Sequence, residues 1–148
     1  MLKKSTLWNQ VFEKCTFEKD LPASLLNPYI DSCRANYETT AKQYGYDSLD
    51  KMLEASSVSK KDFETNLKIQ GEMQAKNVLV GYAIAKAEGY TLSDEDFNKK
   101  AKEYATAYGY SDPSTYINAK GRHMLEEQFV LDYAVAKIIE EANIIPAQ

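Results

Sequence analysis

The sequence predicts an all-α fold, an elongated multi-helix domain built around one long central helix. Apolar residues recur at three- and four-residue spacing in the long segments, no segment shows a sustained period of two, and no Asn-Gly or Asp-Gly hairpin turn occurs. The 148 residues are enough for one ordinary domain. We therefore expect residues 1–148 to form a single helical domain.

The stretch 59–89 is the segment around which the other helices are expected to pack. It begins with a capping-box pattern, Ser59 followed by Asp62, and it ends at Gly89. A helix of about 30 residues is about 45 Å long, whereas a compact domain of this size has a radius of gyration of about 15 Å. One globular core is too small to cover such a helix, which is why the predicted molecule is elongated.

The two halves of this long helix differ in what they can bury. Residues 63–76 carry a narrow apolar stripe among charged and amide side chains, whereas residues 78–87 are apolar on nearly every face. We expect the second half to be buried among other helices and the first half to be thinly packed. Gly71 lies near this change and predicts a bend or a close helix contact, because glycine disfavours a helix interior by about 1 kcal/mol relative to alanine.

The remaining helices are predicted in chain order from their apolar stripes. An amphipathic helix covers 4–15. The second helix opens at Pro22 or at Pro28: Asn27 before Pro28 makes a good N-cap pair, while a start at Pro22 leaves Pro28 as a kink. Further helices are expected over 48–56, 94–108, 113–120 and 122–142.

Three helix ends share one pattern. Gly45, Gly89 and Gly109 are each followed by a tyrosine, as expected where the residue after a C-cap glycine packs back on the last turn. A capping residue for the next helix follows within a few positions. Such short connections predict neighbouring, roughly antiparallel helices.

Composition excludes several classes of protein. The 18 basic and 22 acidic residues give a net charge of −4, which offers no electrostatic footprint for nucleic acid or for an anionic membrane. No signal-peptide pattern opens the chain and no apolar run is long enough to span a bilayer, so we expect a cytoplasmic protein.

Cys15 and Cys33 are expected to be free, largely buried thiols.

The search for catalytic chemistry is negative. His123 is the only histidine, and the sequence contains no GxGxxG, P-loop, HExxH or CxxC motif. We expect His123 to be an ordinary surface or half-buried residue. No catalytic residue, cofactor or metal is predicted, and the chain is not expected to be an enzyme.

Several segments together resemble a known family. They are DLPASLL at 20–26, a helix ending in YG at 44–45, SKKDF at 59–63, NVLVGYAIAKAEGYTLSDEDF at 77–97 and HMLEEQFVLDYAVAKIIEEANI at 123–144. In order and spacing they are similar to the C-terminal chaperone domain of bacterial trigger factor. The resemblance runs from about Leu7 to Ile144.

The resemblance implies a helical body with two protruding helical-hairpin arms that cradle nascent or unfolded polypeptide, aiding folding and export. It also implies a longer parent protein, a peptidyl-prolyl isomerase whose catalytic domain is absent here. Ribosome binding would belong to an absent N-terminal domain. Formation of a homodimer is possible. Two alternative functions remain: a helical module for one folded partner, and an accessory domain of a parvulin-type isomerase.

Candidate peptide-binding residues come from the aromatic and apolar side chains that such a helical chain cannot all bury. Tyr and Met on partly exposed faces make adaptable apolar contacts, which suit recognition of varied partners. Ordinary packing is the competing interpretation for each of them. The candidates are Phe63, Leu67, Ile69 and Met73 on the thinly packed half of the long helix, and Tyr104, Tyr108 and Tyr116 further along the chain.

Overall fold

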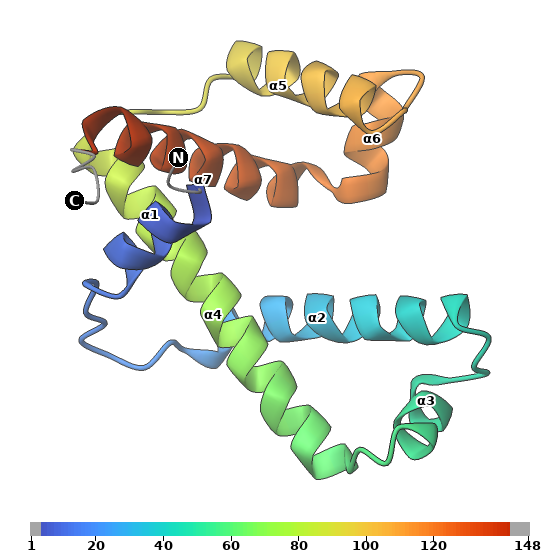
Figure 1. The fold of residues 1–148 in the computed structure, drawn as a ribbon. Helices are drawn as coiled ribbons and strands as arrows, with labels where there is room; N and C mark the ends of the chain where they lie inside the picture. Colours follow the sequence, from blue (N-terminus) through green and yellow to red (C-terminus); the bar gives the residue numbers. More distant parts are fainter. Residues whose placement is uncertain (1–3, 143–148) are drawn as a thin grey trace, which may run out of the picture. The chain divides into compact units, whose positions relative to one another are not determined.

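A computed structural model describes residues 4–142, and all regular secondary structure in that range is helical (Figure 1). The predicted all-α fold is confirmed. The helices are α1 (Lys4–Phe12), α2 (Ala23–Gln43), α3 (Leu49–Ala55), α4 (Lys60–Ala87), α5 (Asp94–Ala107), α6 (Pro113–Lys120) and α7 (Arg122–Glu141).

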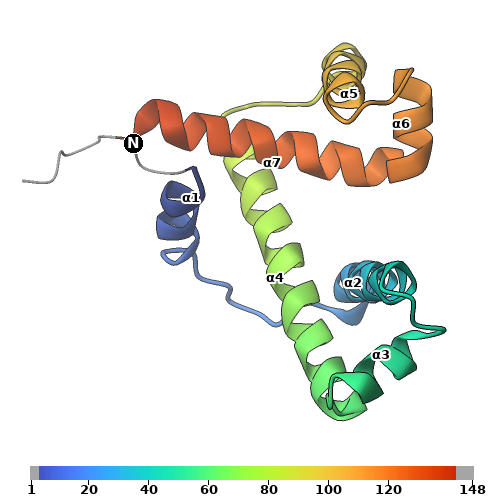
Figure 2. The same cartoon turned by 45° about the vertical axis from the view of Figure 1, so that its right-hand side comes forward.

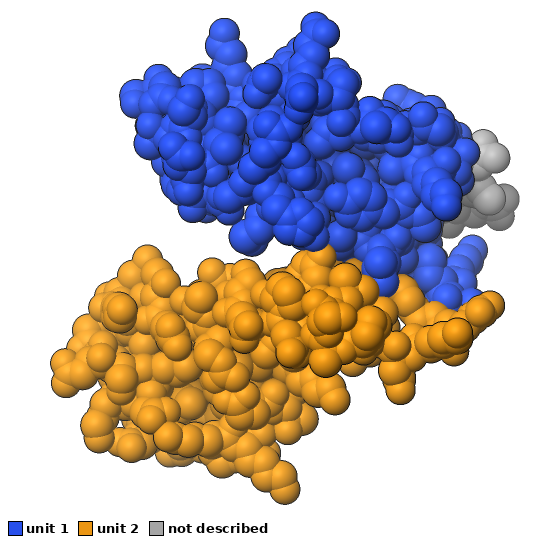
Figure 3. Space-filling model, turned by 180° about the vertical axis from the view of Figure 1, so that it is seen from behind, with its two compact units in different colours: residues 1–16, 77–148 blue, residues 17–76 orange. Residues whose placement is uncertain are grey.

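The described chain divides into two compact units, and α4 contributes to both. Unit 1 contains residues 4–16 and 77–142, and unit 2 contains residues 17–76 (Figure 3). Helix α4 runs unbroken from Lys60 to Ala87. The long helix predicted within the stretch 59–89 is therefore confirmed, with residues 60–76 in unit 2 and 77–87 in unit 1.

The helix ends follow the capping signals in the sequence. The side chains of Ser48, Ser93 and Asp112 each accept a hydrogen bond from a backbone N–H three residues later. Ser59 caps α4 in the same way, accepting from the Asp62 N–H at 3.1 Å. Such caps satisfy N–H groups that have no partner inside the helix.

The three glycine stops have the geometry that the Gly-Tyr pattern predicts. Gly45, Gly89 and Gly109 have φ angles of 81°, 66° and 76°, in the left-handed region that favours glycine. The N–H of the following tyrosine donates to the carbonyl five residues before it, as in the Tyr46 N–H to Ala41 bond of 2.9 Å. This is the Schellman arrangement, which satisfies the last carbonyls of a helix.

The structure decides between Pro22 and Pro28, the two starts that the sequence allowed for the second helix. It begins at Ala23 with Pro22 in the N-cap position and carries Pro28 inside, so a start at Asn27 and Pro28 is wrong. Leu26, in the first turn, is buried on the same helix as Cys33 and Ala41. Pro28 has no N–H, so the helix loses one backbone hydrogen bond there. The free energy gained by packing the first turn offsets this loss.

Unit 2 is held together where α2 crosses α4. A Cβ atom placed on Gly71 would lie 2.7 Å from Ile30 Cγ1 and 2.9 Å from the Ile30 backbone nitrogen. Gly71 thus permits the close helix contact that its position predicted. Around this crossing lies a core of Cys33, Leu53, Phe63 and Leu67.

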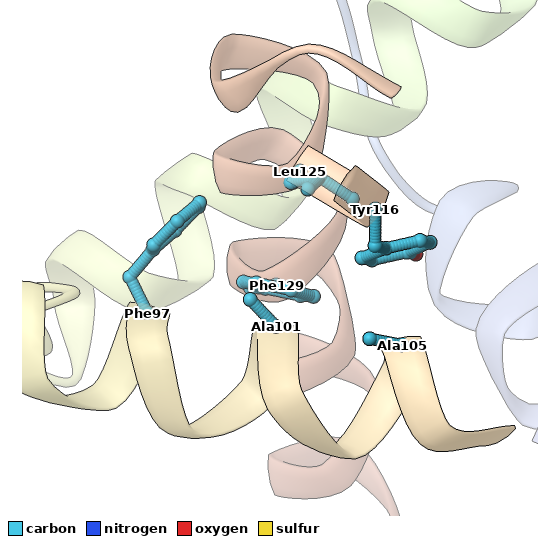
Figure 4. Close-up of a cluster of buried hydrophobic side chains, with 6 residues drawn as sticks. All are labelled: Phe97, Ala101, Ala105, Tyr116, Leu125 and Phe129. Atoms are coloured by element: carbon cyan, nitrogen blue, oxygen red, sulfur yellow. The ribbon is translucent and has the colours of Figure 1, made fainter. Parts of the chain in front are cut away.

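Unit 1 has its core between α5, α6 and α7. Helix α5 lies beside α7, and α6 joins them at one end (Figures 1 and 2). Figure 4 shows the residues that meet there: Phe97, Ala101 and Ala105 of α5, Tyr116 of α6, and Leu125 and Phe129 of α7. The ring centroids of Phe97 and Phe129 are 5.4 Å apart.

The second half of α4 is more buried than the first, as predicted, but it is not buried all round. Val80, Gly81 and Ala85 are buried, and a Cβ on Gly81 would lie 3.2 Å from Leu131 Cδ1 of α7. Tyr82 remains 42% exposed. The expectation that this half is buried among other helices therefore holds for Val80 and Ala85 but not for Tyr82.

Helix α1 ends three residues before the predicted boundary and lies on unit 1 without a buried residue. Its apolar side chains, Leu7, Trp8, Val11 and Phe12, are half-buried. The Trp8 indole N–H donates to the Asn77 side-chain oxygen at 2.6 Å. This bond joins α1 to the second half of α4.

Candidate functional site

Three of the seven candidate residues lie inside the cores. Phe63, Leu67 and Tyr116 are 6%, 0% and 3% exposed. Phe63 packs edge-on against Tyr37, and Tyr116 receives Tyr110 edge-on. The expectation that these three side chains are exposed is wrong, because each faces the helices that pack on its own element.

Three candidates are exposed. Ile69 and Met73 on α4 are each 55% exposed, and Tyr108 at the end of α5 is 64% exposed. The Tyr108 ring is stacked on the buried Tyr116, with centroids 5.9 Å apart and planes 13° from parallel. Tyr108 therefore presents a large apolar surface from a fixed support.

Tyr104 is half-buried and held by polar contacts. Its hydroxyl donates to the Asp132 carboxylate, whose other oxygen accepts from Gln128 Nε2 at 2.8 Å. Burial raises the pKa of Tyr104, and the bond to Asp132 raises it further. With its ring also against Phe129, Tyr104 supports α5 on α7 rather than forming an open surface.

Other large apolar side chains are exposed that the sequence analysis did not select. Tyr44 is 76% exposed, Met124 56%, Tyr82 42% and Val58 39%. Tyr44 and Tyr108 occupy the C-cap positions of α2 and α5, each directly before a glycine with positive φ. That shared position is a sequence signal that could have identified Tyr44.

Unit 1 contains a pocket of about 550 Å³ among the end of α4, the connector 88–93 and the first turns of α5 and α7. No sequence signal indicated it, because it forms only where these segments meet. Its walls are mainly apolar and aromatic, with Lys86, Arg122 and Glu126 as the charged residues. The apolar wall consists of Tyr82, Ala85, Tyr90, Leu92, Phe97 and Val130.

Arg122 is fixed in this wall by three neighbours. Its Nε donates to Glu126 at 2.7 Å, its Nη2 donates to Asp94, and its guanidinium lies 4.3 Å from the centre of the Phe97 ring. The hydrogen bonds to Glu126 and Asp94 raise the pKa of Arg122. Two carboxylates therefore offset this positive charge.

The side chains that commonly bind metal ions are not clustered in the described part of the chain. Between residues 4 and 142 no three His, Cys, Asp or Glu side chains are grouped so as to hold a metal ion. His123 is 82% exposed, with Nε2 3.2 Å from Glu127, which makes it the surface residue expected. Cys15 is half-buried and Cys33 buried, both as free thiols.

Among the helices described, none is both long and apolar enough to cross a membrane.

Comparison with known proteins gives the family. Residues 2–145 match the family described as bacterial trigger factor protein (TF) C-terminus. The trigger factor of Mycoplasma mobile is 30% identical over 110 residues, which are 73% of this chain and 23% of that protein. A Clostridium botulinum trigger factor is 28% identical over 130 residues, 86% of this chain and 30% of that protein.

The chain belongs to the trigger factor C-terminal domain family, which supports a chaperone-type role. It spans less than a third of the length of these two relatives. No solved structure matches the chain significantly.

Proposed function

We propose that this chain is a chaperone domain that holds unfolded or nascent polypeptides without ATP, through many weak apolar contacts. The observation that carries the proposal is the set of large apolar side chains exposed on its helices in a chain of this family. Extensive exposed apolar surface on a soluble protein marks a site of interaction with a partner. Tyr and Met adapt to partners of varied shape.

The proposed client-contacting residues are Ile69 and Met73 in unit 2 and Tyr108 in unit 1. Phe63, Leu67 and Tyr116 support these surfaces from within the cores. Apolar contact stabilises a complex by about 25 cal/mol for each Å² of apolar surface removed from water. The free-energy cost of ordering a flexible client must be subtracted from this gain. Affinity for any one client is therefore modest, and raising the salt concentration should not abolish it, because ionic screening does not act on apolar contacts.

The proposal extends to a longer protein that would contain this chain. A longer trigger factor, of which this chain is the C-terminal part, would act in the cytoplasm, bind the ribosome through its N-terminal domain and carry peptidyl-prolyl isomerase activity in a separate domain. The similarity to trigger factors of other bacteria supports this extension.

Aggregation suppression tests the proposed function. Two unrelated proteins are diluted from denaturant with and without the 148-residue chain, in the absence of nucleotide. We expect the chain to keep both soluble in a dose-dependent way. The opposite result would be no suppression of aggregation, together with binding to one folded partner that an excess of unfolded protein does not displace. That result would favour a module for one specific partner.

A further inference from the structure

The pocket of unit 1 has the size of a cavity that small molecules occupy. Its volume of about 550 Å³ lies within the range of roughly 300–1,000 Å³ that is typical of ligand pockets. Ala85, Phe97 and Val130 line it and are themselves buried. Part of the pocket wall therefore belongs to the buried interior of unit 1.

Three aromatic rings make this wall suited to a flat apolar group. They are the rings of Tyr82, Tyr90 and Phe97. Tyr90 is held in place by stacking on Tyr133, with centroids 3.7 Å apart and planes 7° from parallel. Burial raises the pKa of Tyr82 and of Tyr90, which indicates that water is partly excluded from both side chains. An aromatic ligand can pack edge-on or offset against these rings and gain more than an aliphatic group of equal area.

The charged side chains of the wall leave one positive charge without a partner. They are Lys86, Arg122 and Glu126. Arg122 donates to Glu126 and to Asp94, so its charge is offset. Lys86, in the last turn of α4, forms no ion pair with a carboxylate of residues 4–142. The ammonium group of Lys86 is therefore available to a ligand carboxylate.

The connector between α4 and α5 adds two hydrogen-bond donors. Thr91 and Leu92 lie in this non-helical segment, and both line the pocket. Within the part of the chain that the structure describes, the backbone N–H groups of these two residues donate to no protein acceptor. Water serves them in the free chain. A carboxylate would replace that water with a stronger acceptor, because hydrogen bonds to an ionised group are shorter and stronger than those to a neutral one.

We propose that this pocket is a site for a small aromatic carboxylate, a free molecule rather than a segment of polypeptide. Its ring packs against Tyr82, Tyr90 and Phe97. Its carboxylate pairs with Lys86 and accepts from the two N–H groups of the connector. Ring and charge are recognised within one cavity, so one small molecule satisfies both. The site is independent of the proposed function, whose client-contacting residues do not line the pocket.

Matched small molecules test the chemistry of the site. The probe is 1-naphthaleneacetate, titrated into the 148-residue chain at low salt and followed by NMR. We expect one saturable site, with shifts of the Thr91 and Leu92 amide signals. The neutral 1-naphthaleneacetamide keeps the ring and is expected to bind a few-fold more weakly, because exposed ion pairs are weak. The saturated decahydro analogue of the probe keeps the charge and is expected to lose about threefold to tenfold in affinity.

Matched protein variants locate the site. Lys86→Gln is expected to remove the preference for the acid over the amide. Lys102→Gln changes an exposed lysine of α5 outside the pocket wall and is expected to keep that preference. Tyr82→Ala is expected to weaken binding of both ligands about tenfold, equivalent to about 1.4 kcal/mol. Tyr44→Ala removes an exposed tyrosine from the other unit and is expected to bind both like the unmodified chain.

Four results would overturn the inference: no saturable binding of the probe, equal affinity for the acid and the amide, unchanged affinity after Tyr82→Ala, or an unchanged preference after Lys86→Gln. Displacement of the probe by an unfolded protein would also overturn it, because the pocket would then belong to polypeptide. The proposed function is judged separately by aggregation suppression. Its failure would leave binding of 1-naphthaleneacetate unaffected, and failure of that binding would leave aggregation suppression unaffected.

Discussion

Replacing Gly71 with alanine is expected to destabilise unit 2, although the same replacement stabilises most helix interiors. The reason is the crossing of α2 over α4. A Cβ on Gly71 would lie 2.7 Å from Ile30 Cγ1, 2.9 Å from the Ile30 nitrogen and 3.1 Å from its Cα. Two of these three atoms are backbone and cannot rotate away, so the two helices must separate.

The magnitude follows from two opposing terms. Overpacking a helix contact costs about 1–3 kcal/mol, and alanine returns about 1 kcal/mol of helix propensity. Because backbone atoms make the close approach, we expect the upper part of this range and a net loss of about 1–2 kcal/mol. Gly81→Ala is the matched control in the same helix. Its nearest neighbours are Leu131 Cδ1 at 3.2 Å, on a flexible side chain, and Leu131 Cα at 3.4 Å, so it is expected to be neutral or stabilising by up to about 1 kcal/mol.

Two local reporters measure the effect in each unit. Cys33 is buried in unit 2, and burial raises the pKa of its thiol, so it reacts slowly with a thiol reagent until the unit opens. In a Cys15→Ser background, Gly71→Ala is expected to speed this reaction by about 5–30-fold. The emission of Trp8, the only tryptophan, reports on unit 1 and should stay unchanged. Unchanged or slower modification of Cys33 would refute the packing argument.

Three further outcomes follow from the structure. The double change Met73→Ser with Tyr108→Ser is expected to weaken capture of unfolded clients while circular dichroism and melting temperature stay nearly constant, since both side chains are more than half exposed. Undiminished capture would place the client surface elsewhere. Phe129→Ala is expected to lower the free energy of unfolding by about 3–5 kcal/mol in denaturant titration, because this fully buried ring contacts Phe97 and Tyr104; a loss below about 1 kcal/mol would contradict the described core. The raised pKa of Tyr104 means that its ionised form is disfavoured in the folded chain, so its contribution to stability is constant below its ordinary pKa of 10.0 and is lost progressively as pH rises above that value. Tyr104→Phe should flatten this alkaline decline, and an unaltered pH dependence would contradict the raised pKa of Tyr104.

The local signals in the sequence predicted the helices well because those signals act over a few residues. Ser93 and Asp112 cap the helices that follow them, and Gly45 and Gly89 take the left-handed conformation expected of them. Pro28 is the instructive exception. Its local preference favours a helix start, yet the buried side chain of Leu26 keeps the preceding turn helical.

The candidate surface was only partly predictable. Ile69 and Met73 are exposed as expected, whereas Leu67, between them and Phe63 on the same narrow stripe, is fully buried. A stripe in the sequence identifies the apolar face of a helix. It does not indicate how far along that face the neighbouring helix reaches.

The sequence alone predicted the helical elements and the unbroken long helix, because caps, glycine stops and apolar periodicity are properties of neighbouring residues. The family followed from the resemblance of longer segments to known proteins. Tertiary structure decided which apolar side chains are exposed, why Gly71 can lie against Ile30, and where the pocket lined by Tyr82 and Leu92 forms. These features depend on segments that are distant in the chain, and their positions are fixed by packing between helices rather than by any local preference.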